Sequence, residues 1–506
     1  TAYRRQRQMC IRDSYNIVGD IRAADGGILT LDLAAGSRFE GKAVLDSGND
    51  SQSTLTMAKN SLWTLTGNSQ LKSLQNEQSV IDMTGDNKAF STLSVETLTG
   101  NGGTIIMDID GSQVDASDKI YVTGDFSGSQ ILSLKEINGL DSDPGIGQAA
   151  ENTVLASVNG SGTFTADDQE GTLYWQRYEL GQKDSVASGY TTDWYLKGIT
   201  NLNLPTTSVE AIAASGTLAY HTWRDHDQLL QRLGDLRQHG REEEGVWVRG
   251  KGGKLSRSDQ FEFENKYTQY ELGYDQKLKS TPAYTRYAGI SFSYLDGDSS
   301  YSSGSGENKV KALNIYGTQI GAKGHYLDLV LKYSQLDNDF KVFDTSGNKI
   351  TGDYDQNGLS ISAEYGRKNN LKNNWYIEPQ AQLIIGRLGS SSYTTDRGNN
   401  VYMGGVNSCI GRLGVVAGKK DASGNDVFLK VNMLHEFGGN RDVRMLAGNG
   451  ETLSESQDYG DTWFELGLGG NIKLGNSSHL YGDIERSFGA DIQKKWQINA
   501  GVRFEF

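Results

Sequence analysis

The chain has 506 residues and a formal net charge of -14 at pH 7, with 63 glycines, 25 tyrosines and only 4 prolines. This composition favours many short strands joined by glycine-containing turns. The negative charge argues against a nucleic-acid partner, because binding to a phosphate backbone requires a basic surface. The two cysteines, Cys10 and Cys409, are too few for a disulfide framework. No long apolar run predicts a transmembrane helix, although alternating barrel strands escape such a search.

Residues 1–14 (TAYRRQRQMCIRDS) differ in character from the rest of the chain. They are strongly basic and lack the apolar core of a secretory signal peptide. We interpret them as a foreign or artefactual extension on a fragment of a longer protein. The fold prediction therefore begins at residue 15.

Residues 15–93 alternate short aliphatic segments with turn residues. Segments such as GGILTLDL, KAVLD and SVIDMTG are separated by Gly, Asn, Asp and Ser, with no helical periodicity. This pattern favours stacked rungs of a right-handed parallel β-helix, in which each rung buries Leu, Val or Ile and turns on Asn or Gly. An antiparallel sandwich is the alternative that the same pattern allows.

Residues 94–204 contain more regular strand patterns, including GGTIIMDID, DKIYVTGDFSG and TLYWQRYEL. We expect this region to cap the β-helix, because an uncovered terminal rung would present unpaired backbone groups. No catalytic motif is found in it.

Residues 205–244 predict a long helix. The sequence Thr207-Ser208-Val209-Glu210 fits a capping box, and Gly240 fits a left-handed C-terminal cap. The charges along this helix exclude an ordinary membrane span, because each would cost about 2.5 to 3.5 kcal/mol at the centre of a lipid-facing helix. Such a helix is either a solvated linker or the occupant of a polar lumen. The residues that we assign to a pore helix are Arg224, Asp227, Leu229, Arg232, Leu233, Asp235, Leu236 and Arg237.

Residues 245–506 contain twelve candidate strands of about ten to thirteen residues, the length that a tilted strand needs to cross a membrane. They begin near Gly245, Tyr267, Tyr284, Lys309, His325, Gly358, Trp375, Ser408, Val427, Thr462, His479 and Lys495. The last strand alternates most clearly, with Trp496, Ile498 and Phe504 on one face and Gln497 and Arg503 on the other. A soluble sheet can also alternate, so a single strand decides nothing.

The connections between these strands alternate in length. Short ones are expected near Ser280, Ala322, Asn370 and Asn476, and long ones at residues 339–355, 389–406 and 439–461. Short turns on one side and long loops on the other are typical of outer-membrane barrels. The predicted fold class is therefore all-β, with a right-handed parallel β-helix stem and cap followed by a 12-stranded antiparallel transmembrane β-barrel that has an α-helix in its lumen.

Twelve strands enclose a lumen too wide for side chains alone to fill, and the charged helix is the obvious occupant. Inward carboxylates could then face Arg224, Arg232 and Arg237. The lumen-facing acidic candidates are Glu271, Asp275, Glu378, Glu465 and Glu505. For each of them, a solvated surface position is the alternative.

Four stretches of the sequence carry a resemblance to a known family. They are SLWTLTGNSQLKSL, the pair GGTIIMDID and DKIYVTGDFSG, QRLGDLRQ followed by GVWVRGKGGK, and the terminal WQINAGVRFEF. Together they resemble the type Va autotransporters of the AIDA-like and pertactin-like branch, over nearly everything after residue 14. The resemblance implies a passenger fragment at 15–93, an autochaperone region at 94–204, a linker helix through the pore at 205–244 and a translocator barrel at 245–506.

The resemblance also implies an outer-membrane protein that translocates and displays its own N-terminal passenger, an adhesin associated with virulence in Gram-negative bacteria. The implied partners are outer-membrane lipid, the barrel-assembly machinery, periplasmic chaperones and a host or bacterial surface ligand that the sequence does not identify. Val502, Phe504 and Phe506 match the family's C-terminal assembly signal.

The sequence predicts neither an enzyme nor a metal or cofactor site. A Gly-rich nucleotide-binding loop is missing, so ATP is not expected to power export. No histidine precedes His221, so a Ser-His-Asp passenger protease is not predicted, and the spacing from His221 to His226 puts the two on different helix faces. Some members of the resembled family cleave their passenger at an Asn-Asn junction in the pore helix, and this helix has no such pair. Two other classes stay open: a porin-like channel, and a secreted β-solenoid adhesin without a membrane barrel.

Overall fold

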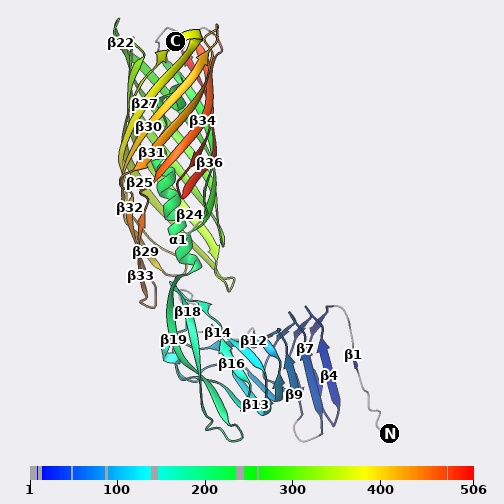
Figure 1. The fold of residues 1–506 in the computed structure, drawn as a ribbon. Coiled ribbons are helices and arrows are strands. Elements are labelled where there is room, and N and C mark those ends of the chain that lie inside the picture. The colour runs from blue at the N-terminus through cyan, green and yellow to red at the C-terminus, as the bar shows by residue number, and fades with distance from the viewer. Residues whose placement is uncertain are drawn as a thin grey trace. The chain divides into compact units, whose positions relative to one another are not determined.

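The computed structural model describes residues 8–9, 14–46, 50–85, 89–137, 146–234, 244–258, 261–475 and 477–506. The chain divides into two compact units, residues 1–206 and 207–506 (Figure 1). The first unit is a β-solenoid, and the second is a β-barrel that contains a helix. Within the described ranges, no helix is both long and apolar enough to span a membrane.

The solenoid consists of two sheets that share one apolar core. The ten-stranded sheet has the order β1 (Gln8–Met9), β4 (Ile28–Leu33), β7 (Gln52–Met57), β9 (Ser69–Asn76), β11 (Thr92–Thr99), β13 (Lys119–Phe126), β15 (Val154–Gly160), β19 (Thr192–Pro205), β18 (Tyr174–Asp184) and β17 (Gln169–Glu170). The seven-stranded sheet has the order β16 (Thr163–Ala166), β14 (Ser129–Glu136), β12 (Asn101–Ile109), β10 (Val80–Asp82), β8 (Leu62–Thr64), β5 (Arg38–Glu40) and β2 (Asn16–Val18). A third, small sheet pairs β3 (Ile21–Ala23) with β6 (Ala43–Leu45), and a 3-10 turn covers Gln148–Ala150.

Parallel stacking of aliphatic side chains holds the rungs together. Leu31 pairs in register with Leu55, Leu55 with Leu74, and Leu74 with Leu98. All four leucines are buried in one core, and such a ladder recurs because each rung presents the same face to its neighbour. The predicted solenoid is confirmed, and the antiparallel sandwich is wrong.

The parallel stacking ends where the strand direction changes, at β19. Parallel pairing continues through β11, β13 and β15 on one sheet and through β16 on the other. The last strand of the unit, β19, then runs antiparallel to β15, and β18 forms a hairpin with β19. This hairpin covers the edge of β15, which would otherwise present unpaired backbone groups.

A buried carboxylate ties two rungs together before this hairpin. Asp118 is fully buried and accepts hydrogen bonds from the backbone N–H of Ser91 at 2.6 Å and of Asp108 at 2.7 Å. Burial raises the pKa of Asp118 to about 7 and that of the neighbouring Asp108 to about 6.

These shifts predict that the rungs around Asp118 are more stable at pH 5 than at pH 8. A carboxyl whose pKa is raised in the folded state, from about 3.9 in an unfolded chain, binds its proton more tightly when folded. Stability is therefore lost as the pH rises through about 6 to 7. Hydrogen exchange of residues 89–137 in the detergent-solubilised chain measures this, and Asp118→Asn should flatten most of the pH dependence. Protection that rises with pH would contradict the prediction.

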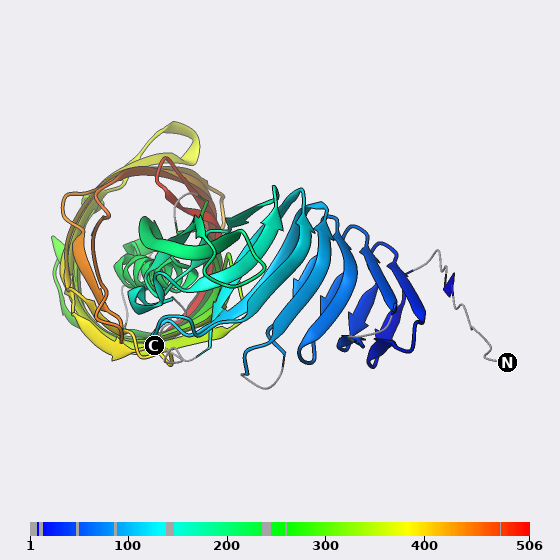
Figure 2. The same ribbon diagram turned by 90° about the horizontal axis from the view of Figure 1, so that it is seen from below.

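The second unit is a closed barrel of twelve antiparallel strands. In chain order these are β20 (Gly245–Arg257), β21 (Phe263–Ser280), β22 (Tyr284–Tyr301), β23 (Gly304–Gly321), β24 (His325–Phe343), β25 (Lys349–Arg367), β27 (Trp375–Leu388), β30 (Val406–Lys420), β31 (Asp426–Glu436), β34 (Thr462–Lys473), β35 (Ser478–Phe488) and β36 (Ile492–Glu505). Each strand pairs with the next, and β36 pairs with β20 to close the ring seen along its axis in Figure 2. Short extra elements are β26 (Asn369–Asn370) and a 3-10 turn at Lys372–Asn374.

The side chains of the barrel strands alternate between two environments. In β36, Gln497, Asn499 and Arg503 are buried inside, whereas Ile498 and Phe504 are about half exposed on the outer face. Large apolar side chains dominate the exposed positions of the other strands as well. An apolar outer face with a polar interior is the arrangement that a lipid bilayer requires. The predicted fold class is confirmed in its solenoid, its twelve-stranded barrel and its internal helix.

Several strands are longer than the expected ten to thirteen residues. Strands β21, β22 and β23 each have 18 residues, and β24 and β25 have 19. Their starts at Phe263, Gly304 and Lys349 precede the predicted positions for this reason. Pairing continues beyond the apolar belt into segments with polar outer positions, such as Asp298 and Lys341, where water rather than lipid surrounds the strands.

The loops confirm two of the three predicted long connections. Residues 389–405 and 437–461 are long and fold into a four-stranded sheet, which we call the loop sheet. It has the order β28 (Ser391–Thr394), β29 (Asn400–Met403), β32 (Asn440–Leu446) and β33 (Thr452–Asp458). The expected long loop at 339–355 is wrong, because β24 and β25 pair through most of it and leave only residues 344–348 as a turn.

Candidate functional site in the barrel lumen

A helix of the chain itself occupies the lumen. Helix α1 (Thr207–Arg224) lies inside the ring of strands, and nearly all of its residues are buried (Figures 1 and 2). Close packing joins its end to the wall. Trp223 lies against Gly358 of β25, where an added Cβ would lie 2.1 Å from the indole Nε1. The polar lumen, rather than a solvated linker, is the environment of this helix.

The packing of Trp223 predicts a large effect for one glycine substitution. In Gly358→Ala the new methyl group collides with a rigid, buried indole, which should lower the stability of the helix-filled barrel by roughly 1 to 3 kcal/mol. Gly250→Ala on β20 is the matched control, because no atom lies within 4 Å of the position that its Cβ would take. Urea titration followed by tryptophan fluorescence measures both. Equal midpoints for the two variants would contradict the packing described here.

The expected continuous helix is wrong within the described residues. Helix α1 ends at Arg224, and the chain resumes as a single turn, α2 (Leu229–Leu233), after an extended break at residues 225–228. Barrel groups bind the backbone that the break exposes: Lys332 Nζ donates to the carbonyl of Asp225 at 3.1 Å, and the N–H of Leu229 donates to Glu364 at 2.9 Å. These contacts replace the helical hydrogen bonds that are lost. Gly240, the expected C-terminal cap, lies outside the described residues.

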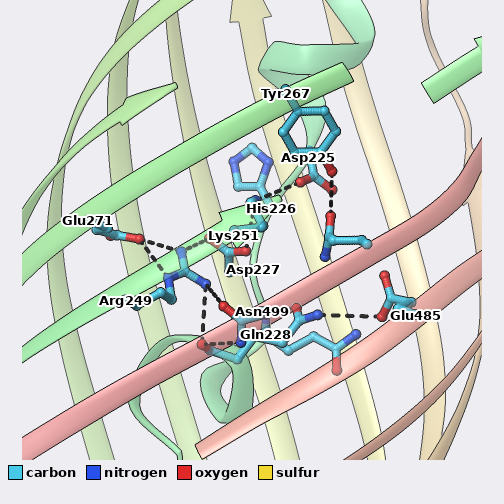
Figure 3. A network of polar contacts seen from close by, with 12 residues as sticks. Asp225, His226, Asp227, Gln228, Arg249, Lys251, Tyr267, Glu271, Glu485 and Asn499 are labelled. Carbon is cyan, nitrogen blue, oxygen red and sulfur yellow. Dashed lines mark hydrogen bonds and ion pairs between the residues drawn. The ribbon is translucent and has the colours of Figure 1, made fainter. Parts of the chain in front are cut away.

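The break presents two carboxylates to three cations of the wall, of which Arg249 and Lys251 are seen in Figure 3. Lys251 Nζ lies 2.8 Å from Asp225 Oδ2 and 3.2 Å from Asp227 Oδ1. Arg249 also forms an ion pair with Asp227, and Lys494 Nζ lies 3.4 Å from Asp225 Oδ1. The cations are buried, and the side chains of Asp225 and Asp227 are 29% and 20% exposed, so the ion pairs are partly shielded from water and are stronger than pairs on an open surface.

Two arginines flank the break and have different partners. Arg232 in α2 forms a bidentate ion pair with Asp328 of β24 at 2.8 Å, and its guanidinium lies over the Tyr316 ring. Arg224 lies over the ring of Trp463, 4.5 Å from its centroid. Two of the three leucines of α2, Leu229 and Leu233, pack into an aromatic cluster with Trp247, Tyr287, Tyr316 and Tyr326. Of the predicted pore-helix residues, Asp235, Leu236 and Arg237 lie outside the described residues.

The five predicted acidic residues are all buried on the lumen side, where they bind groups of the barrel wall. Glu271 pairs with Arg249, Asp275 and Glu505 with Arg503, and Glu465 with Lys494, while Glu378 accepts from Gln380. None of the five forms a hydrogen bond or ion pair with Arg224 or Arg232 that the described residues show, although Glu271 is close enough to Arg232 to interact with it electrostatically. Arg237 lies outside the described residues.

Several other acids bind the occupant directly. Asp328 pairs with Arg232, Glu364 accepts from the N–H of Leu229, and Glu436 accepts from the hydroxyl of Tyr220. Asp483 and Glu485 also accept hydrogen bonds from the side chain of Gln231. Alternation along the strands places these acids inside the barrel but does not identify their partners.

The loop sheet and the residue that follows it contact α1 between Ala213 and Tyr220. Arg441 of β32 is buried and donates to the carbonyl of Gly216 at 2.9 Å, and Gln457 of β33 donates to the carbonyl of Ala213. Tyr459 stacks on Tyr220 with ring centroids 4.5 Å apart. The loop sheet therefore holds the occupant at one end, and the wall groups around α2 hold it at the other.

A small cavity lies beside the described part of the helix. A cavity of about 80 Å³ lies next to the break and is lined by groups that include His221, Asp225, Trp463 and Lys494. This is room for a few water molecules and not for a diffusing solute. Within the described part of the chain, no three His, Cys, Asp or Glu side chains lie together as a metal site would require.

Two family models match the chain. Residues 246–485 match the autotransporter beta-domain, and residues 71–198 match pertactin. The probable autotransporter YcgV of Escherichia coli K12 is 27% identical over 524 residues, covering 95% of this chain and 53% of that protein. The BrkA autotransporter of Bordetella pertussis is 27% identical, with 95% and 46% covered, and the pertactin autotransporter of Bordetella bronchiseptica is 29% identical, with 96% and 56% covered.

One solved structure, the beta domain of the Bordetella autotransporter BrkA, covers 52% of this chain and 100% of that domain, at 27% identity and a TM-score of 0.44. The chain spans about half the length of the curated relatives that it matches.

An apolar outer surface, a polar lumen and a threaded helix define an outer-membrane barrel that carries a solenoid. The chain belongs to the autotransporters, with a pertactin-like passenger region followed by an autotransporter beta-domain. The barrel accordingly lies in the outer membrane in contact with its lipid, and the passenger is on the cell surface.

Proposed function

We propose that this chain translocates its own passenger across the outer membrane and remains as its anchor. The observation that carries this proposal is α1, which connects directly to the solenoid in sequence and lies inside the barrel formed by the same chain. A chain that leaves a segment behind in its own pore has passed through that pore. Folding of the solenoid rungs outside the cell opposes movement of the chain back through the pore, because a folded rung is wider than the unfolded chain that crossed.

The displayed solenoid is proposed to be an adhesin, in line with the pertactin-like region at residues 71–198. Its ligand is a host or bacterial surface group that these residues do not identify. The barrel-assembly machinery is the proposed reader of Val502, Phe504 and Phe506, and the latter two expose aromatic rings on the outer face of the barrel. Periplasmic chaperones are the proposed carriers of the chain before insertion, and residues 94–204 are the proposed autochaperone.

We propose no enzymatic activity for these 506 residues. Some relatives are named as serine proteases, such as the Pet autotransporter of Escherichia coli O44:H18. That protein is matched over only 34% of its length, and residues 1–220 of this chain contain no histidine for a Ser-His-Asp arrangement.

Surface display tests the proposed translocation. Residues 15–506 are expressed in a Gram-negative host behind a secretory signal and an N-terminal epitope tag, and the tag is expected to be accessible on intact cells. A tag retained in the periplasm beside a folded, heat-modifiable barrel would overturn the proposal.

Conductance in planar bilayers separates the proposal from a porin-like channel. The intact barrel is expected to be nearly closed, because the helix leaves a cavity of only about 80 Å³. Deletion of residues 207–233 is expected to open it. A large conductance from the intact barrel would favour the porin instead.

A further inference from the structure

The three cations that form ion pairs with Asp225 and Asp227 come from the two strands that close the barrel. Arg249 and Lys251 lie on β20, the first strand, and Lys494 lies on β36, the last. These strands pair with each other along their length, with Leu255 opposite Lys494. One short segment of the threaded chain therefore contacts both sides of the seam.

The wall depends on this segment for its charge balance. Arg249 also pairs with Glu271, and Lys494 with Glu465 and Glu485. Lys251 differs: within the described ranges its ion pairs are with Asp225 and Asp227 of the threaded chain, and its side chain is only 3% exposed. Withdrawal of the two aspartates would leave a buried ammonium beside Arg249 without its carboxylate partners, which is strongly unfavourable.

The charges around the break favour one position of the threaded chain along the lumen and disfavour positions shifted from it in either direction. Asp225 and Asp227 lie between Arg224 and Arg232. A shift along the lumen by one helical turn, about 5.4 Å, would move the acidic pair away from the three cations and bring an arginine towards them. Like charges at such a distance in a shielded lumen repel strongly.

We propose that Asp225 and Asp227 act as an electrostatic stop. Their ion pairs with Arg249, Lys251 and Lys494 set the position at which the exported chain comes to rest in the barrel. This inference rests on the proposed translocation. It assigns the two aspartates a positioning role: they follow α1 into the lumen, and they are held where both closing strands contribute a cation. The same contacts brace β20 against β36.

Cross-linking measures the resting position. In the tagged chain of residues 15–506 with Cys409→Ser, Gly216→Cys and Met403→Cys place thiols on α1 and the loop sheet. A Cβ on Gly216 would lie 2.9 Å from Met403 Sδ and 2.8 Å from Arg441 Nη1, the end of a long side chain that has to shift slightly. A short bis-methanethiosulfonate reagent should join them in cells that display the tag. Adding Asp225→Asn/Asp227→Asn is expected to raise the ratio of unlinked to linked chain roughly tenfold. Glu307→Gln, an exposed outer carboxylate paired with Lys309, is the control and should change nothing.

A third variant distinguishes a change in the resting position of the chain from a general loss of barrel stability. Adding Lys251→Gln to Asp225→Asn/Asp227→Asn removes the stranded ammonium, so the temperature of the heat-modifiable gel shift should recover while cross-linking stays low. Cross-linking by Asp225→Asn/Asp227→Asn equal to that of the parent would overturn the stop, and so would recovery of cross-linking with Lys251→Gln. If the parent cross-links but shows no accessible tag, the proposed translocation fails, and a stop for an exported chain fails with it. An accessible tag together with unchanged cross-linking in Asp225→Asn/Asp227→Asn overturns the stop alone.

Discussion

A chain that lacks the last strand, residues 494–506, is expected to show no accessible passenger tag and no heat-modifiable barrel. Strand β36 pairs with β35 on one side and with β20 on the other. Its removal leaves two open sheet edges in lipid, where each unpaired backbone group costs several kcal/mol. The loss should therefore be complete rather than partial. Whole-cell antibody binding and unheated gel migration measure the two effects.

Removal of residues 15–27 from the solenoid is the matched control, because it deletes the same number of residues without touching the barrel. It should leave both readouts intact. Display of the passenger by the chain without β36 would mean that the seam between β20 and β36 is not needed for the pore.

Replacement of Asp275 by leucine is expected to destabilise the barrel by about 3 to 5 kcal/mol. Asp275 of β21 and Arg503 of β36 form a fully buried bidentate ion pair, one contact of which is 2.6 Å, across Gly245 of β20. The variant leaves the guanidinium buried, with the carboxylate of Glu505 at 3.5 Å as a poorer partner. Urea titration of the barrel in lipid vesicles measures the loss.

The double variant Asp275→Leu/Arg503→Met should recover most of that stability, because it removes both charges rather than one. Asp298→Leu, at an exposed outer position of β22, is the control and should change stability by less than about 0.5 kcal/mol. A double variant no more stable than Asp275→Leu would show that the two side chains act independently of each other.

Strand alternation predicts which acidic side chains point into the lumen. It places Glu271 and Asp275 inside the barrel because side chains on a strand alternate between two faces, and both are buried there. Asp328 and Glu364 occupy equally inward positions, and the same alternation is the signal that finds them. Their importance comes from Arg232 and from the N–H of Leu229, which lie 96 and 135 positions away in the chain.

The helix break cannot be predicted from local sequence. Residues 207–233 read as one helix because the capping box, the leucine spacing and the lack of proline all agree. The break forms because Lys332 and Glu364 of the wall bind the backbone that a helix would have satisfied itself. Tertiary contacts of this kind override a modest helical propensity.

Local patterns in the chain suffice for the two-part architecture, the number of barrel strands, the occupied lumen and the face on which each strand residue lies. They suffice because a period of two residues and the signals at helix ends are properties of neighbouring residues. Three-dimensional packing alone sets which charges meet, where the helix stops, and the contact of Asp225 and Asp227 with both closing strands. Those contacts depend on the stagger of twelve strands around a closed ring, and a closed ring brings together residues that no local pattern relates.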